Sequence, residues 1–404
     1  MPIRSQFKIF ADSNLNSPTP FVYLDSAATT HKPQSVVDVI CEFYQTQNAN
    51  VHRGSYTTAN LVTARYEQAR INIAGFIGAN DHTDIVWTKG TTESINLVAY
   101  AWGENNISSG DTIVVLGSEH HANFVPWQQL ALRKNAQFEV VNILPNGDID
   151  LTHYQALMAN KPKLVALQHC SNALGNIHPI KSLTELAKQT GATVLVDGAQ
   201  AVAHLSVNVK DIGCDFYAFS GHKMYGPTGV GVLYIAPEIK SEISPFHFGG
   251  EMIQNVTREK TTFRPIPAML ETGTPNISGI LGLNAALEFI QSAPAIEALN
   301  HNVQTYNYLI EQLSQINNVQ IIGNSNNNIG VTSFVVKGES VSDIGTLLNE
   351  QNVAVRCGHH CAMPLMQALN INGTVRVSLG IYNDKSDIDL FISALKKSLS
   401  ILSC

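Results

Sequence analysis

Between residues 84 and 235, short apolar segments alternate with segments that have the spacing of amphipathic helices. The apolar segments are rich in aliphatic and aromatic residues and are no longer than a typical buried strand. Strands that alternate with helices in this way form a mostly parallel sheet with both faces covered. The predicted strands are Asp84–Thr88, Asp111–Leu116, Lys163–His169, Ala192–Asp197, Asp215–Ser220 and Gly229–Ile235, and the predicted helices include Glu93–Trp102, Val125–Lys134 and Ile180–Gln189.

The pattern changes near Ser278. Two helical segments come first, then short strands, and a helical segment ends the chain, which predicts a smaller α+β domain. We therefore expect a large domain over residues 20–277 and a small domain formed by residues 1–19 and 278–404. The predicted elements of the second part are helices Ser278–Ser292, Ala295–Gln315 and Lys385–Leu402, with strands Val319–Ile322, Gly330–Val336, Val353–Arg356 and Thr374–Leu379.

Two charged residues stand at the ends of neighbouring predicted strands. Asp197 ends one strand, and Lys223 follows closely after another. Because the carboxyl ends of parallel strands meet at one edge of a sheet, both side chains should reach the same site. Pyridoxal phosphate needs such a pair, since a lysine amine forms its Schiff base and a carboxylate keeps its ring nitrogen protonated. A surface lysine and a helix N-cap at Asp197 are the plainer alternatives.

Further residues near these strand ends are suited to hold the phosphate of that cofactor. Ser220 and His222 precede Lys223 and can donate hydrogen bonds to it, although His222 can also be a buried core histidine. Thr91 and Thr92 follow Gly90 at the start of a predicted helix, where backbone N–H groups and hydroxyls bind phosphate. Threonine in that position is also a common helix cap.

Three more side chains are candidates for contact with the cofactor ring. His120 is the histidine we select from the pair at 120 and 121 to stack on the ring and carry protons. Gln200 and Asn172 are amides that can bond the phenolic oxygen of the cofactor. The alternatives are a loop histidine, a capping role for Gln200 and a turn at Asn172.

The segment Arg356–Pro364 carries Cys357 and Cys361 around two histidines. A cysteine nucleophile reacts as the thiolate and so belongs on an accessible loop, which this Gly-His-His stretch provides. Zinc is the rival interpretation, but ligands so crowded rarely close one tetrahedron, and no second Cys/His pair follows at finger spacing. We therefore expect no metal site.

Arginine inside an apolar strand needs an anion. Arg376 is such a residue, and a clamp on a substrate carboxylate suits it, with an internal salt bridge as the alternative. Arg356 is a second, weaker candidate for the same substrate. His52 lies in a loop before a long helix and can reach a site, including one in a partner subunit, and Thr274 is similarly placed to reach across a dimer.

Composition excludes several classes of function. The net charge of −7 and the lack of a basic run argue against nucleic acid as the main partner. No apolar run is long enough to cross a bilayer, and the N-terminal residues lack the apolar core of a signal peptide. Six cysteines scattered over 404 residues do not form a secreted disulfide framework. We expect a cytoplasmic protein.

Taken together, the motifs resemble the group II cysteine desulfurases, a branch of the class V aminotransferase-like enzymes that includes selenocysteine lyases. The likeness runs along nearly the whole chain. It implies fold-type I with a large pyridoxal-phosphate domain built on a seven-stranded sheet. The motifs that carry it are 23–29, 50–53, 89–96, 119–127, 197–200, 219–227, 271–276, 358–364 and Arg376.

The resemblance also implies a function. L-cysteine would become L-alanine, Lys223 would be the Schiff-base lysine, and Cys361 would accept the sulfur as a persulfide. A homodimer and a sulfur-acceptor protein of the SUF type, serving iron–sulfur cluster assembly or other sulfur metabolism, would follow. Selenocysteine lyase and cysteine sulfinate desulfinase remain alternatives on the same residues, and a transaminase is disfavoured by the cysteine loop. Cys357 departs from the small or hydroxyl residue expected there, and it is either neutral or able to form a disulfide with Cys361.

Overall fold

The structure is a computed structural model that describes residues 3–11, 20–323 and 327–403. Its largest element is a seven-stranded sheet in which β3 to β7 run parallel, while β8 runs antiparallel to its neighbours β7 and β2. This confirms the predicted α/β class. In sheet order, the strands are β2 (Ile85–Thr88), β8 (Gly231–Ile235), β7 (Phe216–Ser220), β6 (Thr193–Asp197), β5 (Leu164–Gln168), β3 (Thr112–Leu116) and β4 (Gln137–Val141).

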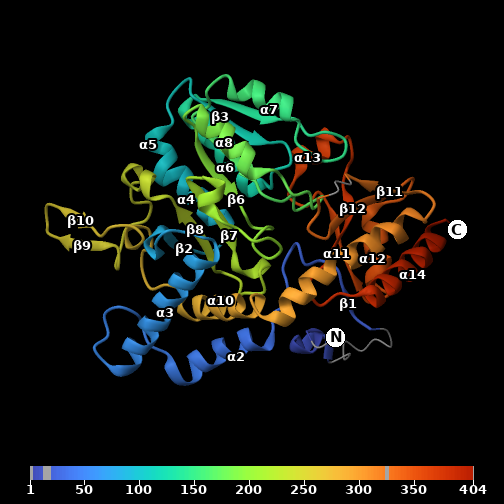
Figure 1. The fold of residues 1–404 in the computed structure, drawn as a ribbon, viewed down its shortest axis with the longest axis horizontal. Coiled ribbons are helices and arrows are strands. Elements are labelled where there is room, and N and C mark those ends of the chain that lie inside the picture. The colour runs from blue at the N-terminus through green and yellow to red at the C-terminus, as the bar shows by residue number, and fades with distance from the viewer. Residues whose placement is uncertain (1–2, 12–19, 324–326, 404) are drawn as a thin grey trace.

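Helices enclose the sheet. In Figure 1, α6 (Val125–Lys134), α7 (Leu151–Met158) and α8 (Ile180–Gln189) gather around β3, whereas α2 (Gln34–Glu42), α3 (Thr57–Phe76) and α10 (Ile277–Ile290) lie beyond β2 and β8. The central strands are apolar on both faces because both faces are covered, and β3, β5, β7 and β8 are buried at every residue. Shorter helices are α1 (Lys8–Ala11), α4 (Thr91–Val98), α5 (Glu104–Asn106) and α9 (Val209–Ile212).

The six strands predicted in this region all form. Helices α6 and α8 also have the predicted bounds, whereas the segment predicted as one helix over 93–102 is α4 followed by a π-helical turn at Ala99–Gly103. β4 was not predicted from the sequence; it is an edge strand whose residues are mostly half-exposed. An edge strand packs little apolar surface, and its apolar signal is correspondingly weak.

The register of the parallel strands decides where the polar side chains meet. Gln168 of β5 pairs with Asp197 of β6, and Asp197 pairs with Ala218 of β7. Three strands therefore end side by side at one edge of the sheet. Ligands of open α/β sheets bind at this edge.

A smaller sheet forms the second part of the molecule, to the right in Figure 1. Its four strands run antiparallel in the order β11 (Val319–Ile322), β12 (Val331–Val336), β15 (Thr374–Ser378), β14 (Arg356–Gly358). Helices α11 (Ala293–Ser314), α12 (Val341–Asn349) and α14 (Lys385–Leu402) pack beside it, and α13 (Met363–Ala368) follows β14. The α+β pattern predicted after residue 278 is present.

The strand predicted over 353–356 is two strands. β13 (Val353–Ala354) pairs in parallel with β1 (Val22–Tyr23), and β14 then pairs with β15. Val22 and Leu24 are fully buried in the core cluster of the second sheet, together with residues of β12, β15 and α14. The packing thus puts this segment with the small domain rather than with the large one. The domain limits at residues 19 and 277 otherwise stay a prediction, and residues 1–2 and 12–19 lie outside the described part.

One hairpin escaped the sequence analysis. Strands β9 (Ile253–Val256) and β10 (Thr261–Phe263) pair antiparallel and project from the body on the side away from the small domain (Figure 1). Both strands are short and largely exposed, which leaves no apolar alternation to detect. Among the described residues, no helix is both long enough and apolar enough to cross a membrane.

Replacing Leu24 tests the assignment of the N-terminal segment to the second core. Leu24→Ala removes a fully buried side chain, and we expect a loss of about 2–5 kcal/mol in the free energy of unfolding, measured by urea denaturation. Leu132→Ala is the control, because Leu132 is 70% exposed and its loss should change stability by no more than about 0.5 kcal/mol. Equal effects of the two variants would contradict this packing.

Candidate active site

A cavity of about 280 Å³ lies where β5, β6 and β7 end. The four-stranded sheet closes it with residues from β14, β15 and the loop after β14. Its walls bring together nearly every side chain proposed from the sequence, although these come from distant segments of the chain. The predicted residues that line it are Thr91, Thr92, His120, Asn172, Asp197, Gln200, Ser220, His222, Lys223, Arg356, Cys361 and Arg376.

Lys223 and Asp197 face this cavity from the ends of adjacent strands. Lys223 ends a single 3₁₀ turn, Gly221–Lys223, that follows directly on β7. Burial lowers the pKa of Lys223 from its ordinary value, and the attraction of Asp197 only partly opposes this shift. Burial likewise raises the pKa of Asp197. The charged form of each group is therefore less favourable than it would be in water.

These two residues fit the predicted cofactor. In the part of the chain that the structure describes, the Asp197 carboxylate accepts one hydrogen bond, from the Ala199 N–H at 2.9 Å. A buried carboxylate with so little support calls for a cationic partner, which a protonated pyridine nitrogen would supply. The amine of Lys223 lines the same cavity.

Another part of the cavity wall suits a phosphate group. Gly90 has a φ of 155°, which favours glycine, and its neighbour Thr91 begins α4. The Ser220 Oγ lies 2.8 Å from both the backbone N and the Oγ1 of Thr91. Hydroxyls and N–H groups therefore cluster at the start of a helix, where an anion is favoured. His222 lies beside them, with Nδ1 3.2 Å from the Thr29 Oγ1.

The two amides proposed for the cofactor ring already have protein partners. The Gln200 Nε2 donates to the Ala27 carbonyl at 2.8 Å. The Asn172 Nδ2 donates to the His360 carbonyl at 2.6 Å, and its Oδ1 accepts from the Gln168 Nε2 at 3.2 Å. Both side chains line the cavity. Their contact with a phenolic oxygen stays a prediction, whereas Asn172 joins the segment after β5 to the loop after β14.

His120 is held as a neutral ring. Burial, followed by the nearby positive charges of Lys223, His121 and Arg376, lowers its pKa from 6.5 to about 3. Its Nδ1 accepts a hydrogen bond from the Ala122 N–H at 3.0 Å, so the ring proton is on Nε2. A neutral imidazole in the cavity wall can stack on an aromatic ring and can accept or release a proton.

Cys361 lies in a strained loop that is held in place by hydrogen bonds to His121. His360 and Cys361 have φ values of 53° and 56°, in the left-handed region. The His121 N–H donates to the Cys361 carbonyl at 2.7 Å, and the His121 Nε2 accepts from the Met363 N–H at 3.1 Å. Strain of this kind persists only where surrounding contacts enforce it. Together with Asn172, His121 thus fixes the exposed thiol of Cys361 at the cavity.

Cys357 has a different setting. It belongs to β14, where neighbouring side chains point to opposite faces, and Arg356 faces the cavity. The Cys357 side chain instead packs on the core of the small domain next to Gly345 of α12, and burial raises its pKa to about 11. A disulfide with Cys361 would require β14 to leave this core. The described residues bring no group of three or more His, Cys, Asp or Glu side chains together as a metal site.

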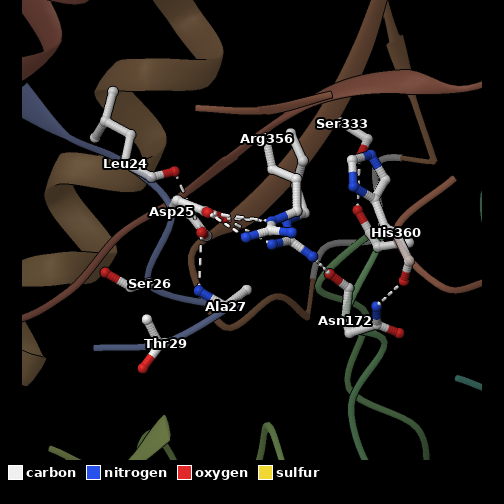
Figure 2. Close-up of polar contacts among 12 residues, drawn as sticks. Leu24, Asp25, Ser26, Ala27, Thr29, Asn172, Ser333, Arg356 and His360 are labelled. Carbon is white, nitrogen blue, oxygen red and sulfur yellow. Dashed lines mark hydrogen bonds and ion pairs between the residues drawn. The ribbon is translucent and has the colours of Figure 1, made fainter. Parts of the chain in front are cut away.

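The two arginines share a carboxylate that the sequence analysis did not select. Figure 2 shows Asp25 facing Arg356 of β14. The same carboxylate lies 2.8 Å from the Nη2 of the buried Arg376 of β15. Asp25 stands in the resemblance motif at 23–29, but nothing in a single sequence indicates its partners. His121 was also passed over in favour of His120, because sequence does not distinguish adjacent histidines.

Two predicted residues lie away from the cavity. His52 lies 2.9 Å from the Glu67 carboxylate through its Nε2, and it lines a separate cavity with Tyr66 and Arg70. Thr274 lines a third cavity, with Tyr44 and Lys89 among others. Neither side chain contributes to the site of its own chain. Their predicted role across a dimer stays a prediction.

Comparison with known proteins gives a consistent result. Residues 22–391 match the family described as aminotransferase class V. A probable cysteine desulfurase of Vibrio cholerae is 41% identical over 402 residues, which are 99% of this chain and 98% of the relative. Solved structures of cysteine desulfurases from Thermococcus onnurineus NA1 and of CsdA from Escherichia coli superpose with TM-scores of 0.92 and 0.91. Each is 37% identical, and they cover 98% and 99% of this chain and 97% and 98% of their own.

One buried neutral histidine, His178, predicts acid lability. Burial lowers the pKa of His178 from 6.5 to about 4, so below about pH 6.5 the unfolded chain binds a proton that the folded protein excludes. The free energy of unfolding should therefore fall by about 1.4 kcal/mol per pH unit for this group as the pH decreases toward 4. Urea denaturation of His178→Gln should show a shallower pH dependence than wild type.

Ser118→Ala is the matched control for that variant. It removes the hydroxyl that lies 3.3 Å from the His178 Nε2 but keeps the titrating ring, so the pH dependence should persist. A wild-type slope in His178→Gln would show that His178 is not the buried neutral group described.

Proposed function

Since this chain belongs to the class V aminotransferase family and is a cysteine desulfurase that uses pyridoxal phosphate, we propose that Cys361 receives the sulfur of L-cysteine as a persulfide. One observation carries the proposal. The exposed thiol of Cys361 lines the same small cavity as Lys223 and Asp197. Cys361 nevertheless lies far from both in sequence and follows a strand of the other sheet.

Lys223 and Asp197 would hold the cofactor, with Thr91, Thr92, Ser220 and His222 on its phosphate. Bound there, pyridoxal phosphate supplies an electron sink that stabilises negative charge at the substrate Cα. Lys223 is then suited to remove and return the Cα proton, because burial lowers its pKa and increases the neutral fraction of the amine.

The sulfur transfer is balanced within the protein and its substrate. The Cys361 sulfur forms a bond to the substrate sulfur, and the substrate bond between Cβ and sulfur breaks. The electron pair of the broken bond stays on Cβ, which takes up a proton and becomes the methyl group of alanine. Sulfur is oxidised to the persulfide level while Cβ is reduced, so no further oxidant is required. The neutral ring of His120 is placed to carry a proton in this exchange.

The carboxylate of the substrate would bind at the arginine end of the cavity. Arg376 and Arg356 both line it, and guanidinium groups bind carboxylates through paired hydrogen bonds. Asn172 contributes its backbone carbonyl, which accepts from the Arg376 Nη1 at 3.0 Å and fixes that guanidinium.

The persulfide would pass to a sulfur-acceptor protein of the SUF type for iron–sulfur cluster assembly or other sulfur metabolism. The exposure of Cys361 supports this, because a partner thiol must reach it. A cytoplasmic location is supported by the free thiols at Cys41, Cys170, Cys214, Cys357 and Cys361. A homodimer in which His52 and Thr274 reach a partner site completes the proposal.

Selenocysteine lyase and cysteine sulfinate desulfinase activities use the same cavity. Their carbon–heteroatom bonds break more readily than the Cβ–sulfur bond of cysteine, so neither substrate needs the Cys361 nucleophile. The requirement for Cys361 therefore separates cysteine desulfuration from both alternatives.

Alanine and sulfide formation from L-cysteine with a reductant tests the proposal. Cys361→Ala should lose at least about a hundredfold in turnover with cysteine, because the sulfur has no acceptor, whereas Lys223→Ala should lose activity with every substrate. Cys357→Ala is the matched control, since that side chain faces the core of the small domain, and it should keep wild-type turnover. A Cys361→Ala enzyme that desulfurates cysteine at the wild-type rate would refute the assignment.

A further inference from the structure

Asp25 forms the most connected ion pair of the site, and the proposed function gives it no role (Figure 2). Its Oδ1 accepts from the Arg376 Nη2 at 2.8 Å and from the Arg356 Nε at 3.1 Å. Its Oδ2 accepts from the Arg356 Nη2 at 2.9 Å and again from Nε at 3.1 Å. One carboxylate therefore accepts from both arginines that face the cavity.

The backbone around Asp25 is fixed independently of this side chain. Ser378 N donates to the Leu24 carbonyl at 2.8 Å, and Ser26 N donates to the Ser378 carbonyl at 3.3 Å. The N-terminal segment is thus joined to the end of β15, next to Arg376. A substitution at Asp25 that keeps the size of the side chain changes the charge at the arginines while these backbone contacts remain.

Asp25 leaves part of Arg376 available. The Arg376 side chain is 2% exposed, and its Nη1 is occupied by the Asn172 carbonyl. Its Nε has no hydrogen-bond partner among the described residues. A buried guanidinium with one unpaired N–H group has an unsatisfied hydrogen-bond donor, which costs free energy and creates a demand for an acceptor. A carboxylate entering the cavity can meet that demand.

The charges at this end of the cavity add up to one net positive charge, because Asp25 offsets one of the two arginines. Burial lowers the pKa of Arg376, and Asp25 opposes the shift by favouring the cation. The field of the arginines also extends to Cys361, whose charge interacts with both of them. The sulfur end of a bound substrate would therefore experience any change in this balance.

We infer that Asp25 is a specificity-determining residue that matches the site to substrates whose only anionic group is the α-carboxylate. This inference rests on the proposed function, in which Arg376 and Arg356 bind that carboxylate. L-cysteine with a neutral thiol has one anionic group, its α-carboxylate, and is accommodated. L-cysteine sulfinate carries a second negative charge at the sulfur end, and Asp25 disfavours it by cancelling the cation that would stabilise it.

The test compares alanine formation from cysteine and from cysteine sulfinate by the holoenzyme. Both substrates yield alanine; the sulfinate releases sulfur dioxide, which hydrates to sulfite, so no added oxidant is involved. Asp25→Asn should raise the kcat/KM ratio of sulfinate to cysteine roughly tenfold. This is the size expected for one unit charge about 10 Å away at an effective dielectric constant of about 20. Asp25→Glu keeps the charge and should keep the wild-type ratio.

A second variant covers the case in which Asp25→Asn fails to fold. Arg356→Gln removes a cation from a half-exposed side chain, and it should lower the same ratio. The double variant restores the wild-type net charge and should return the ratio toward that of wild type. Asp215→Asn is the control, because Asp215 also accepts from a cation, Lys188, but lies at the far end of β7. Its ratio should not change.

The outcomes separate this inference from the function on which it rests. If Arg376→Gln leaves the KM for cysteine unchanged, Arg376 does not bind the carboxylate, and the inference about Asp25 fails with that assignment. The persulfide role of Cys361 is decided separately, by the Cys361→Ala result. If Arg376→Gln raises that KM while Asp25→Asn and Arg356→Gln leave the substrate ratio unchanged, only the role of Asp25 is overturned.

Discussion

Burial of the charged groups at the ends of β6 and β7 is the constraint on which the site depends. Asp197 ends a mostly apolar strand, and Lys223 closely follows another. Burial shifts both pKa values toward the neutral forms. Such groups are tolerated where a partner charge is near or where a ligand completes the environment. The parallel register supplies the geometry, because Gln168, Asp197 and Ala218 lie side by side at the edge of the sheet.

The four-stranded sheet completes this edge through a segment from the opposite end of the chain. β1 pairs with β13, and Leu24 is buried in the small core. Asp25, the next residue, forms a bridge with Ser378 at the end of β15. The carboxylate of Asp25 therefore reaches two arginines from two different strands. The cost of burying the Asp25 carboxylate is offset by the two arginines, and the cost of burying the arginines is offset by Asp25. The three side chains therefore form one electrostatic unit.

The cysteine loop combines accessibility with restraint. The Cys361 thiol is exposed, while its backbone is held in the left-handed region by His121 and by Asn172 at the preceding carbonyl. A nucleophile on a free loop would sample many positions, and ordering it would cost conformational entropy at every turnover. The hydrogen bonds from the large domain remove that cost in advance and keep the thiol at the cavity.

The sequence by itself determined the α/β class, the strand ends and the residue types of the site. The periodicity of apolar residues and the polar residues at strand ends can both be read from neighbouring positions in the chain. Lys223, Asp197 and Cys361 could be selected in this way. The exposed strands β4, β9 and β10 gave no such signal. The core-facing position of Cys357 became clear only when β14 showed which face its side chain occupies. The salt bridges of Asp25 join residues more than three hundred positions apart. Only the tertiary structure could decide them, since long-range packing, not local pattern, sets which buried charge meets which partner.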